Sequence, residues 1–392
     1  MKILFISDVY FPRVNGVSTS IETFRHELRK LGHTVHLIAP DYLTPSRDES
    51  DILRLPARNI PLDPEDRFMR YGVAMGKLDA LRQENYDIIH IQTPFVAHYL
   101  GVQFSRLLAI PCVETYHTFF EEYLHHYIPF MPKKLMRHVA RRFSRHQGNS
   151  LHGMIVPSHP MRAVLTNYGI TTLTQVIPTG MEPASFVPGN RAAFRGKFSI
   201  PESRPLLLFL GRVAFEKNIG FLLEVLVRVR SQVPDVLLII AGEGPARLKL
   251  EQQAERLGLN DNIMFIGYLD RHTELNDCYC AADLFIFASR TETQGLVLLE
   301  AMAQGTAVVS TAELGTLDVL KDRLGVLIAQ EDVSDFSDKV TYLLKDAGER
   351  RSIGEAGRIY AMGWSASRQA ERLEKFYGEL ISSFKQKNNI NS

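Results

Sequence analysis

The chain has 392 residues, of which 45% are hydrophobic and 23% charged; this is the composition of a folded globular protein and excludes a disordered one. Its 45 Lys and Arg residues balance 44 Asp and Glu residues, so the total charge gives no reason to expect a nucleic-acid partner. The length favours two domains of roughly 150 to 200 residues each, with a cleft between them.

The distribution of apolar residues and cysteines indicates a cytoplasmic protein. The first apolar run, Ile3–Ile6, is too short for a signal peptide, and the sequence has no apolar stretch long enough to span a bilayer. The three cysteines, Cys112, Cys278 and Cys280, lack the second ligand pair that a zinc site needs. We therefore expect reduced cysteines in the cores and a cytoplasmic location.

The first half alternates short apolar runs with amphipathic stretches, which is typical of the strand–helix units of a parallel sheet. The expected strands are Ile3–Ile6, Thr34–Ala39, Ile88–Ile91, Cys112–Thr115 and Met154–Val156. The segment Ile177–Asn190 is rich in Pro and Gly and shows neither the helix nor the strand period, so it predicts a linker.

The second half repeats the pattern. Its expected strands are Leu206–Leu210, Val236–Ala241, Ile263–Ile266, Leu284–Phe287 and Ala307–Val309. The predicted fold class is α/β, with two doubly wound, Rossmann-like domains at residues 1–190 and 191–365. The amphipathic helix Arg368–Phe384, in the segment 366–392, either ends the second domain or crosses back onto the first.

Because ligands of open parallel sheets bind at the carboxyl ends of the strands, residues that follow the strands carry the functional weight. In the first domain, Gly16 follows the first strand and permits close approach of a ligand to the backbone, and His117 follows the fourth main strand. Taken alone, the glycine is more simply a turn residue and the histidine a structural one.

A basic amphipathic helix is predicted from Pro132 to Gln147. Lys133, Arg137, Arg141 and Arg145 recur every four residues and form one stripe, with Lys134 and Arg142 beside it. The residues Leu135, Met136, Val139 and Phe143 occupy another side, and the aromatic and histidine-rich segment Tyr123–Met131 precedes the helix. The pattern suits a helix at an anionic membrane surface, and it suits equally a helix that packs on its own domain with a solvated basic face.

In the second domain, Arg212 and Lys217 lie on a predicted strand-to-helix loop. Two cations there can neutralise the charge that develops on a diphosphate leaving group. The alternative is a structural ion pair with Glu216.

The segment Thr291–Gly305 follows the strand Leu284–Phe287 and predicts a loop and then a helix. Gly295 and Leu296 lie at the helix start, where free N–H groups and the helix dipole favour a phosphate. Glu292 can accept hydrogen bonds from sugar hydroxyls, and Glu300 can reach a ribose hydroxyl. An isolated pair of this kind would more simply be a solvated loop residue and an exposed helix residue.

Together these residues resemble the Gly-Arg, Lys and Glu-x7-Glu signatures of glycosyltransferase family 4, a family of retaining enzymes with the GT-B fold, and the resemblance covers essentially the whole chain. It implies that Arg212 and Lys217 bind the diphosphate of a nucleotide-sugar, Glu292 the transferred sugar and Glu300 the ribose. It further implies that the Gly16 loop faces the diphosphate and that His117 contacts the sugar near its reacting carbon.

The chain departs from the family pattern at three places. It has Glu292-Thr-Gln-Gly295 where relatives often have Glu-Gly-Phe-Gly, Lys217-Asn218 for Lys-Gly, and Glu313–Asp318 for a glycine pair followed by Pro-Glu. These changes bear on which donor sugar is used. No Asp-x-Asp triplet ends a strand, and the acidic residues at Asp48–Asp51 and Asp63–Asp66 lie in apparent loops, so we expect no obligatory metal and no cofactor besides the nucleotide-sugar.

The run Tyr116–His125 and the basic helix resemble bacterial diacylglycerol glucosyltransferases, which are peripheral membrane enzymes. The resemblance implies UDP-glucose as donor and a membrane lipid, diacylglycerol, as acceptor. Three alternatives stay open: a soluble transferase acting on a sugar, a sugar phosphate or another small acceptor; a nucleotide-sugar epimerase; and a nucleotide-sugar binding module.

Overall fold

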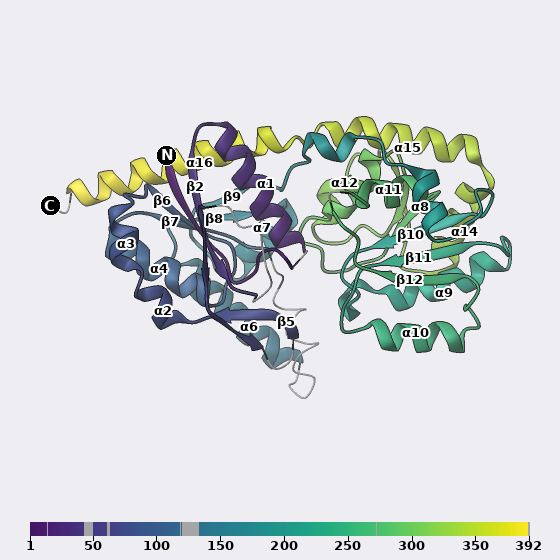
Figure 1. Cartoon of the computed structure of the whole chain (residues 1–392), viewed down its shortest axis with the longest axis horizontal. Helices are drawn as coiled ribbons and strands as arrows, with labels where there is room; N and C mark the ends of the chain where they lie inside the picture. The colour runs from purple at the N-terminus through teal and green to yellow at the C-terminus, as the bar shows by residue number, and fades with distance from the viewer. Residues whose placement is uncertain are drawn as a thin grey trace. The chain divides into compact units, whose positions relative to one another are not determined.

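The computed structural model describes residues 1–13, 15–42, 50–60, 63–117, 119, 133–271 and 273–390. The chain divides into two units, Met1–Gly180 together with Ala366–Ser392, and Met181–Ser365 (Figure 1). The unit boundary falls at Gly180–Met181, inside the segment Ile177–Asn190 and before the position near Asn190 that the sequence suggested.

The first unit contains a parallel sheet in the order β3-β2-β1-β6-β7-β8-β9. Its strands are β1 (Lys2–Ile6), β2 (Thr34–Pro40), β3 (Ile52–Leu55), β6 (Ile88–Ile91), β7 (Cys112–Thr115), β8 (Gly153–Val156) and β9 (Thr174–Val176). A separate antiparallel pair joins β4 (Ala57–Ile60) to β5 (Asp63–Met69). The acidic residues Asp63–Asp66 therefore lie in a strand, and their assignment to a loop was wrong; a proline and three acidic residues in this run hide the strand pattern.

Helices connect the strands of the first unit. They are α1 (Gly16–Lys30), α2 (Tyr71–Met75), α3 (Leu78–Gln83), α4 (Val96–Leu108), α6 (Lys133–Gly148), α7 (His159–Asn167) and α16 (Ala366–Ile390). The last helix lies far along the chain from the sheet, yet Leu373, Phe376 and Tyr377 share one buried cluster with Ile3 and Ile88. A hydrogen bond of 2.5 Å between His90 Nδ1 and the Tyr377 hydroxyl ties the same helix to β6.

The second unit repeats the architecture with a parallel sheet in the order β12-β11-β10-β13-β14-β15. Its strands are β10 (Leu206–Leu210), β11 (Leu237–Ala241), β12 (Ile263–Gly267), β13 (Leu284–Phe287), β14 (Ala307–Ser310) and β15 (Val326–Ile328). Its helical elements are η1 (Pro183–Phe186), α8 (Arg191–Lys197), η2 (Phe215–Lys217), α9 (Ile219–Arg230), α10 (Arg247–Arg256), α11 (Leu275–Ala281), α12 (Leu296–Ala303), α13 (Thr316–Leu320), α14 (Val333–Lys345) and α15 (Ala347–Met362).

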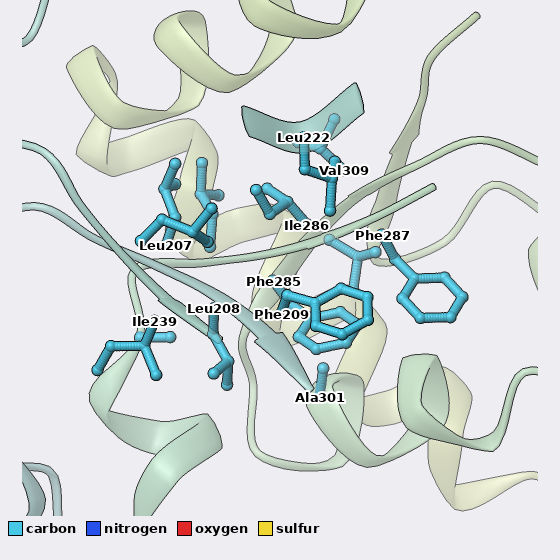
Figure 2. Packing of buried hydrophobic residues seen from close by; sticks show 14 of the residues in the cluster. Leu207, Leu208, Phe209, Leu222, Ile239, Phe285, Ile286, Phe287, Ala301 and Val309 are labelled. Atoms are coloured by element: carbon cyan, nitrogen blue, oxygen red, sulfur yellow. The ribbon is translucent and has the colours of Figure 1, made fainter. Parts of the chain in front are cut away.

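The core of the second unit explains why its strands read as continuous apolar runs. Helices cover the sheet, so both faces of β10, β11 and β13 are buried and every side chain must be apolar. Figure 2 shows Phe209, Phe285 and Phe287 within this cluster, which also contains Leu222 of α9 and Ala301 of α12. The rings of Phe209 and Phe287 stack with centroids 5.8 Å apart. The predicted fold class, two doubly wound parallel sheets, is confirmed.

The segment after the unit boundary is held by side chains of the second unit. Gln304 Nε2 donates to the carbonyl oxygens of Ser185 and Val187, and Gln304 Oε1 accepts from the N–H of Gly189 at 3.0 Å. A Cβ at Gly189 would lie 2.2 Å from the Asn276 carbonyl oxygen, so glycine is required for this contact. Residues 182–190 are therefore part of the second unit.

Candidate active site

Two loops of the second unit leave the sheet where its strand order reverses. From β10 the sheet continues through β11 on one side and through β13 on the other. The loop after β10 carries Arg212 and Lys217, and the loop after β13 carries Glu292 and Gly295. This reversal is the position where open parallel sheets bind ligands.

The structure brings Lys217 and Glu292 together across this position. Lys217 Nζ lies 2.5 Å from Glu292 Oε1, and the two side chains are 19% and 18% exposed. Lys217 occupies the end of η2, and Asn218, at a φ of +58°, begins α9 directly after it. The sequence alternative of a structural pair between Lys217 and Glu216 is not what forms; the partner comes from the neighbouring loop.

Glycines allow the backbone of these loops to approach closely. A Cβ at Gly242, after β11, would lie 2.0 Å from the carbonyl oxygen of Gly211 at the end of β10. A Cβ at Gly315 would lie 2.1 Å from the carbonyl carbon and oxygen of Thr293, and the Gly315 N–H donates to the Glu292 carbonyl oxygen at 2.8 Å. The loop that presents Glu292 is thus fixed from behind by backbone contacts that no larger residue permits.

Gly295 and Leu296 open α12 as the sequence predicted. Gly295 has a φ of +94°, in the left-handed region that favours glycine, and no side chain caps the helix. The N–H groups of the first turn therefore have no capping side chain of the helix's own. Arg212 is half-buried on the loop between β10 and η2.

Glu300 is buried, at 5% exposure, so the alternative of an exposed helix residue is wrong for it. Its Oε1 accepts from Arg271 Nη2 at 2.8 Å, and its Oε2 accepts from the Tyr279 hydroxyl at 2.9 Å. Burial lowers the pKa of Arg271, but the adjacent Glu300 carboxylate raises it, and the net shift is upward. The sequence analysis missed both partners, although Arg271 follows β12 and the strand-end rule points to such a residue.

In the first unit, Gly16 is the first residue of α1, after Asn15, whose side chain accepts from the Ser18 N–H. Apart from its chain neighbours and the backbone of its own helix, no heavy atom of the described residues lies within 4 Å of a Cβ built on Gly16, so the space beside it is open. His117 follows β7, and its Nε2 lies 3.1 Å from Oε1 of Gln92, which follows β6. Burial lowers the pKa of His117 to about 4, so the ring is neutral near pH 7.

Asp8 is a buried carboxyl at the end of β1 that the sequence analysis did not single out. Its Oδ2 accepts from the Thr93 hydroxyl and from the Ala97 N–H, each at 2.9 Å. Burial, only partly opposed by these hydrogen bonds, raises the pKa of Asp8 to about 7. Asp8 thereby holds the loop between β6 and α4, which also carries Gln92.

The basic helix α6 packs on its own unit through one face and exposes another. Met136 and Ala140 are buried, at 2% and 0% exposure, whereas Leu135 and Val139 are 51% and 46% exposed. The predicted apolar side is therefore divided: Met136 belongs to the packing face, and Leu135 and Val139 lie on the surface.

The exposed cations of this helix are Lys134, Arg137, Arg141, Arg142 and Arg145. Arg141 and Arg145 border a surface hollow of about 530 Å³ together with His138 and Tyr168. The side chain of Lys133 and the segment Tyr123–Met131 lie outside the described residues.

Across the described ranges, no group of three or more His, Cys, Asp and Glu side chains is placed to hold a metal ion. The same part of the chain contains no helix with the length and apolar character needed to cross a membrane. Cations and carboxylates from neighbouring strand ends are what this site offers, and they can bind a polyhydroxylated anion.

Comparison with known proteins identifies the class. Residues 14–185 match the family described as Glycosyltransferase Family 4, and residues 190–360 match Glycosyl transferases group 1. The chain is 33% identical over 98% of its length to alpha-monoglucosyldiacylglycerol synthase of Streptococcus pneumoniae, covering 87% of that protein. It is 28% identical to the protein of the same name from Acholeplasma laidlawii, over 79% of this chain and 80% of that one. The chain belongs to glycosyltransferase family 4 and is a hexosyltransferase with glycolipid synthases among its relatives.

Solved structures agree on the fold. Sucrose-phosphate synthase from Thermosynechococcus elongatus superposes with a TM-score of 0.78 at 21% identity, over 97% of this chain and 99% of that one. The HepE protein of Anabaena in complex with UDP-glucose superposes with a TM-score of 0.75 at 18% identity, over 98% and 100% of the chains. The GT-B fold that the resemblance implied is confirmed.

Proposed function

We propose that this enzyme transfers glucose from UDP-glucose to diacylglycerol with retention of the anomeric configuration. The donor half of the proposal is carried by the contact between Lys217 and Glu292, which sets a cation for a diphosphate beside a carboxylate for a sugar. The acceptor half is supported by the names of the two similar synthases, at 33% and 28% identity. HepE, of the same fold, has been solved with UDP-glucose bound.

In this proposal the second unit is the nucleotide-sugar-binding domain. Arg212 and Lys217 neutralise the diphosphate, and the N–H groups at Gly295 and Leu296 add donors to it at the start of α12. Glu292 accepts hydrogen bonds from the hexose hydroxyls, and Glu300 accepts them from the ribose.

The first unit is then the acceptor-binding domain. Gly16 lies in open space at the start of α1, where its N–H can approach a phosphate. His117, neutral above its lowered pKa of about 4, offers a hydrogen bond to the hexose without adding charge.

The reaction breaks the bond between the hexose C1 and the oxygen of the β-phosphate, and the electron pair leaves with UDP. The acceptor hydroxyl oxygen forms its bond to C1 on the same face, and its proton passes to the departing phosphate oxygen. Retention follows because attack and departure share one face of the sugar. The residues of the site act on charge: Lys217 and Arg212 stabilise UDP as it leaves.

We further propose that α6 brings the enzyme to an anionic membrane. Five exposed cations and the exposed Leu135 and Val139 share the surface of this helix. Each cation close to an anionic leaflet contributes about 1 kcal/mol, so the set suffices for reversible binding.

The test is a transfer assay with radiolabelled UDP-glucose and liposomes of phosphatidylglycerol with or without diacylglycerol. We expect a labelled glucosyl lipid only when diacylglycerol is present. Its linkage should be α by NMR, because the linkage in UDP-glucose is α and the reaction retains it. Lys217→Met and Glu292→Ala should each lower the rate by about a hundredfold or more, while both variants stay folded. Release of UDP that requires no lipid would refute diacylglycerol as the acceptor. An isomerised free sugar would refute the transfer reaction.

A second candidate is mannosyl transfer from GDP-mannose. The chain is 27% identical over 93% of its length to GDP-mannose-dependent alpha-mannosyltransferase of Mycolicibacterium smegmatis. The same assay with GDP-mannose, and with soluble acceptors in place of liposomes, separates the two candidates by the nucleotide that is released.

A further inference from the structure

The carboxylate of Glu300 is oriented by two neighbouring side chains of the protein. Arg271 Nη2 donates to Oε1 at 2.8 Å, and the Tyr279 hydroxyl donates to Oε2 at 2.9 Å. Burial raises the pKa of Tyr279 well above its ordinary value, so the phenol keeps its proton and must be the donor. Both oxygens of Glu300 are therefore acceptors held in a fixed plane.

Among the described residues, these two donors leave half of the hydrogen-bonding capacity of the carboxylate unused. Each carboxylate oxygen can accept two hydrogen bonds, and Arg271 and Tyr279 use one on each oxygen. Two neighbouring acceptor positions match the two adjacent hydroxyls of a ribose, each of which can donate one hydrogen bond.

Arg271 is the member of this network that balances the charge. Tyr279 is neutral and fully buried, whereas Arg271 brings a permanent positive charge and reaches the surface, with its side chain 27% exposed. Without Arg271, the described residues would leave the buried Glu300 with one neutral hydrogen-bond donor and no counter-charge. This arrangement is unfavourable and lets the side chain turn away.

We infer that Arg271 is a positioning residue for nucleotide recognition: it holds the Glu300 carboxylate in the plane that accepts the two ribose hydroxyls. The inference rests on the proposed function, because it assumes that a nucleotide-sugar binds at this strand edge. Arg271 acts through Glu300 and not on the diphosphate.

The test compares two ligands that differ only in the ribose. Calorimetric titration with UDP and with 2′,3′-dideoxyuridine diphosphate gives the ratio of the two dissociation constants, which isolates the hydroxyl contacts. We expect the wild-type protein to prefer UDP by about tenfold or more, since hydrogen bonds to a charged acceptor are strong. In Arg271→Met the preference should fall below about threefold, while affinity for the dideoxy ligand stays within about twofold of wild type.

Controls separate positioning from general damage. Arg271→Lys keeps the charge and should retain part of the preference, whereas Arg228→Met, which breaks a surface pair with Asp338 on the same unit, should keep all of it. In a Glu300→Gln background, Arg271→Met should change the ratio less than about twofold, because the two residues act as one. Tyr279→Phe removes a donor without unpairing a charge and serves if Arg271→Met does not fold; it too should lower the ratio.

The outcomes are distinct. If Arg271→Met lowers the affinity for both ligands equally and leaves the ratio of their dissociation constants unchanged, the inference is wrong. The arginine then contacts the phosphates or has only a structural role. An unchanged ratio in Tyr279→Phe overturns it as well. If the wild-type protein binds no uridine diphosphate at all, the proposed function fails first.

Discussion

The ion pair between Lys217 and Glu292 leads us to predict opposite effects on binding and on catalysis. Removing the charge of Glu292 should strengthen the binding of UDP and abolish turnover. Lys217 Nζ lies 2.5 Å from Glu292 Oε1, so the carboxylate holds the lysine. UDP carries no sugar for Glu292 to bind, so its diphosphate must draw Lys217 away from the carboxylate. Glu292→Gln keeps the shape of the side chain and lifts this competition.

The size of the effect follows from the burial of the pair. Its side chains are 19% and 18% exposed, between a surface pair and a buried one, so we take about 1 kcal/mol, or about fivefold in affinity. Lys217→Met removes a charge-assisted hydrogen bond to the diphosphate, so it should lower the affinity for UDP by about tenfold or more. The gain in Glu292→Gln should shrink as salt is raised, because the pair is partly accessible to solvent.

Calorimetric titration of UDP at two salt concentrations measures these changes, and the glucosyl-transfer assay measures turnover. Asp338→Asn is the matched control, since it removes a carboxylate that pairs with Arg228 elsewhere on the same unit. It should change neither quantity. Weaker or unchanged UDP binding in Glu292→Gln would show that the carboxylate does not restrain Lys217, and the assignment of the diphosphate to this lysine would lose its support.

Two further predictions concern stability. Gly315→Ala places a methyl group 2.1 Å from the backbone of Thr293, and it should lower the free energy of unfolding by about 2 kcal/mol and weaken UDP binding. Gly196→Ala, where the added methyl group has open space, should do neither. Equal melting temperatures for the two variants would contradict the packing. Asp8 has a raised pKa of about 7, so it stabilises the folded protein most below the unfolded pKa near 3.8, and this contribution is lost as pH rises through 7. Between pH 5.5 and 8, the free energy of unfolding of the wild-type protein should fall by about 2 kcal/mol relative to that of Asp8→Asn, as measured by denaturant titration. Parallel pH profiles of the two proteins would refute the raised pKa of Asp8.

The fold was predictable to the extent that strands are buried on both faces. Ile88–Ile91, Cys112–Thr115, Leu206–Leu210 and Leu284–Phe287 were expected with the bounds that the structure gives them. The strands that were missed are edge strands or lie outside the main sheets. β3, β9 and β15 each end a sheet, and β4 and β5 form a separate pair. Such strands bury less of their surface, so their sequences need not be apolar, and β9 reads Thr-Gln-Val.

The candidate site was predictable by residue type but not by partner. Lys217 and Glu292 were each expected at a strand end, yet their contact spans 75 residues of sequence. Glu300 was expected to reach ribose, but Arg271 and Tyr279, which bury and orient it, come from α11 and the loop before it. Spacing along one helix says nothing of the neighbouring helix, so these partners required coordinates.

The contact between Lys217 and Glu292 follows from the way a doubly wound sheet is assembled. The chain leaves β10 to build β11 and β12 on one side, and only then returns to lay β13 against β10 on the other. Loops from these two strands turn in opposite directions, so their first residues face each other with no further strand end between them. The same reversal lies between β1 and β6 in the first unit, and there Asp8 meets Thr93 and Ala97. Strand-end motifs on either side of a reversal should therefore be interpreted as pairs, because the topology, and not their distance in sequence, decides that they touch.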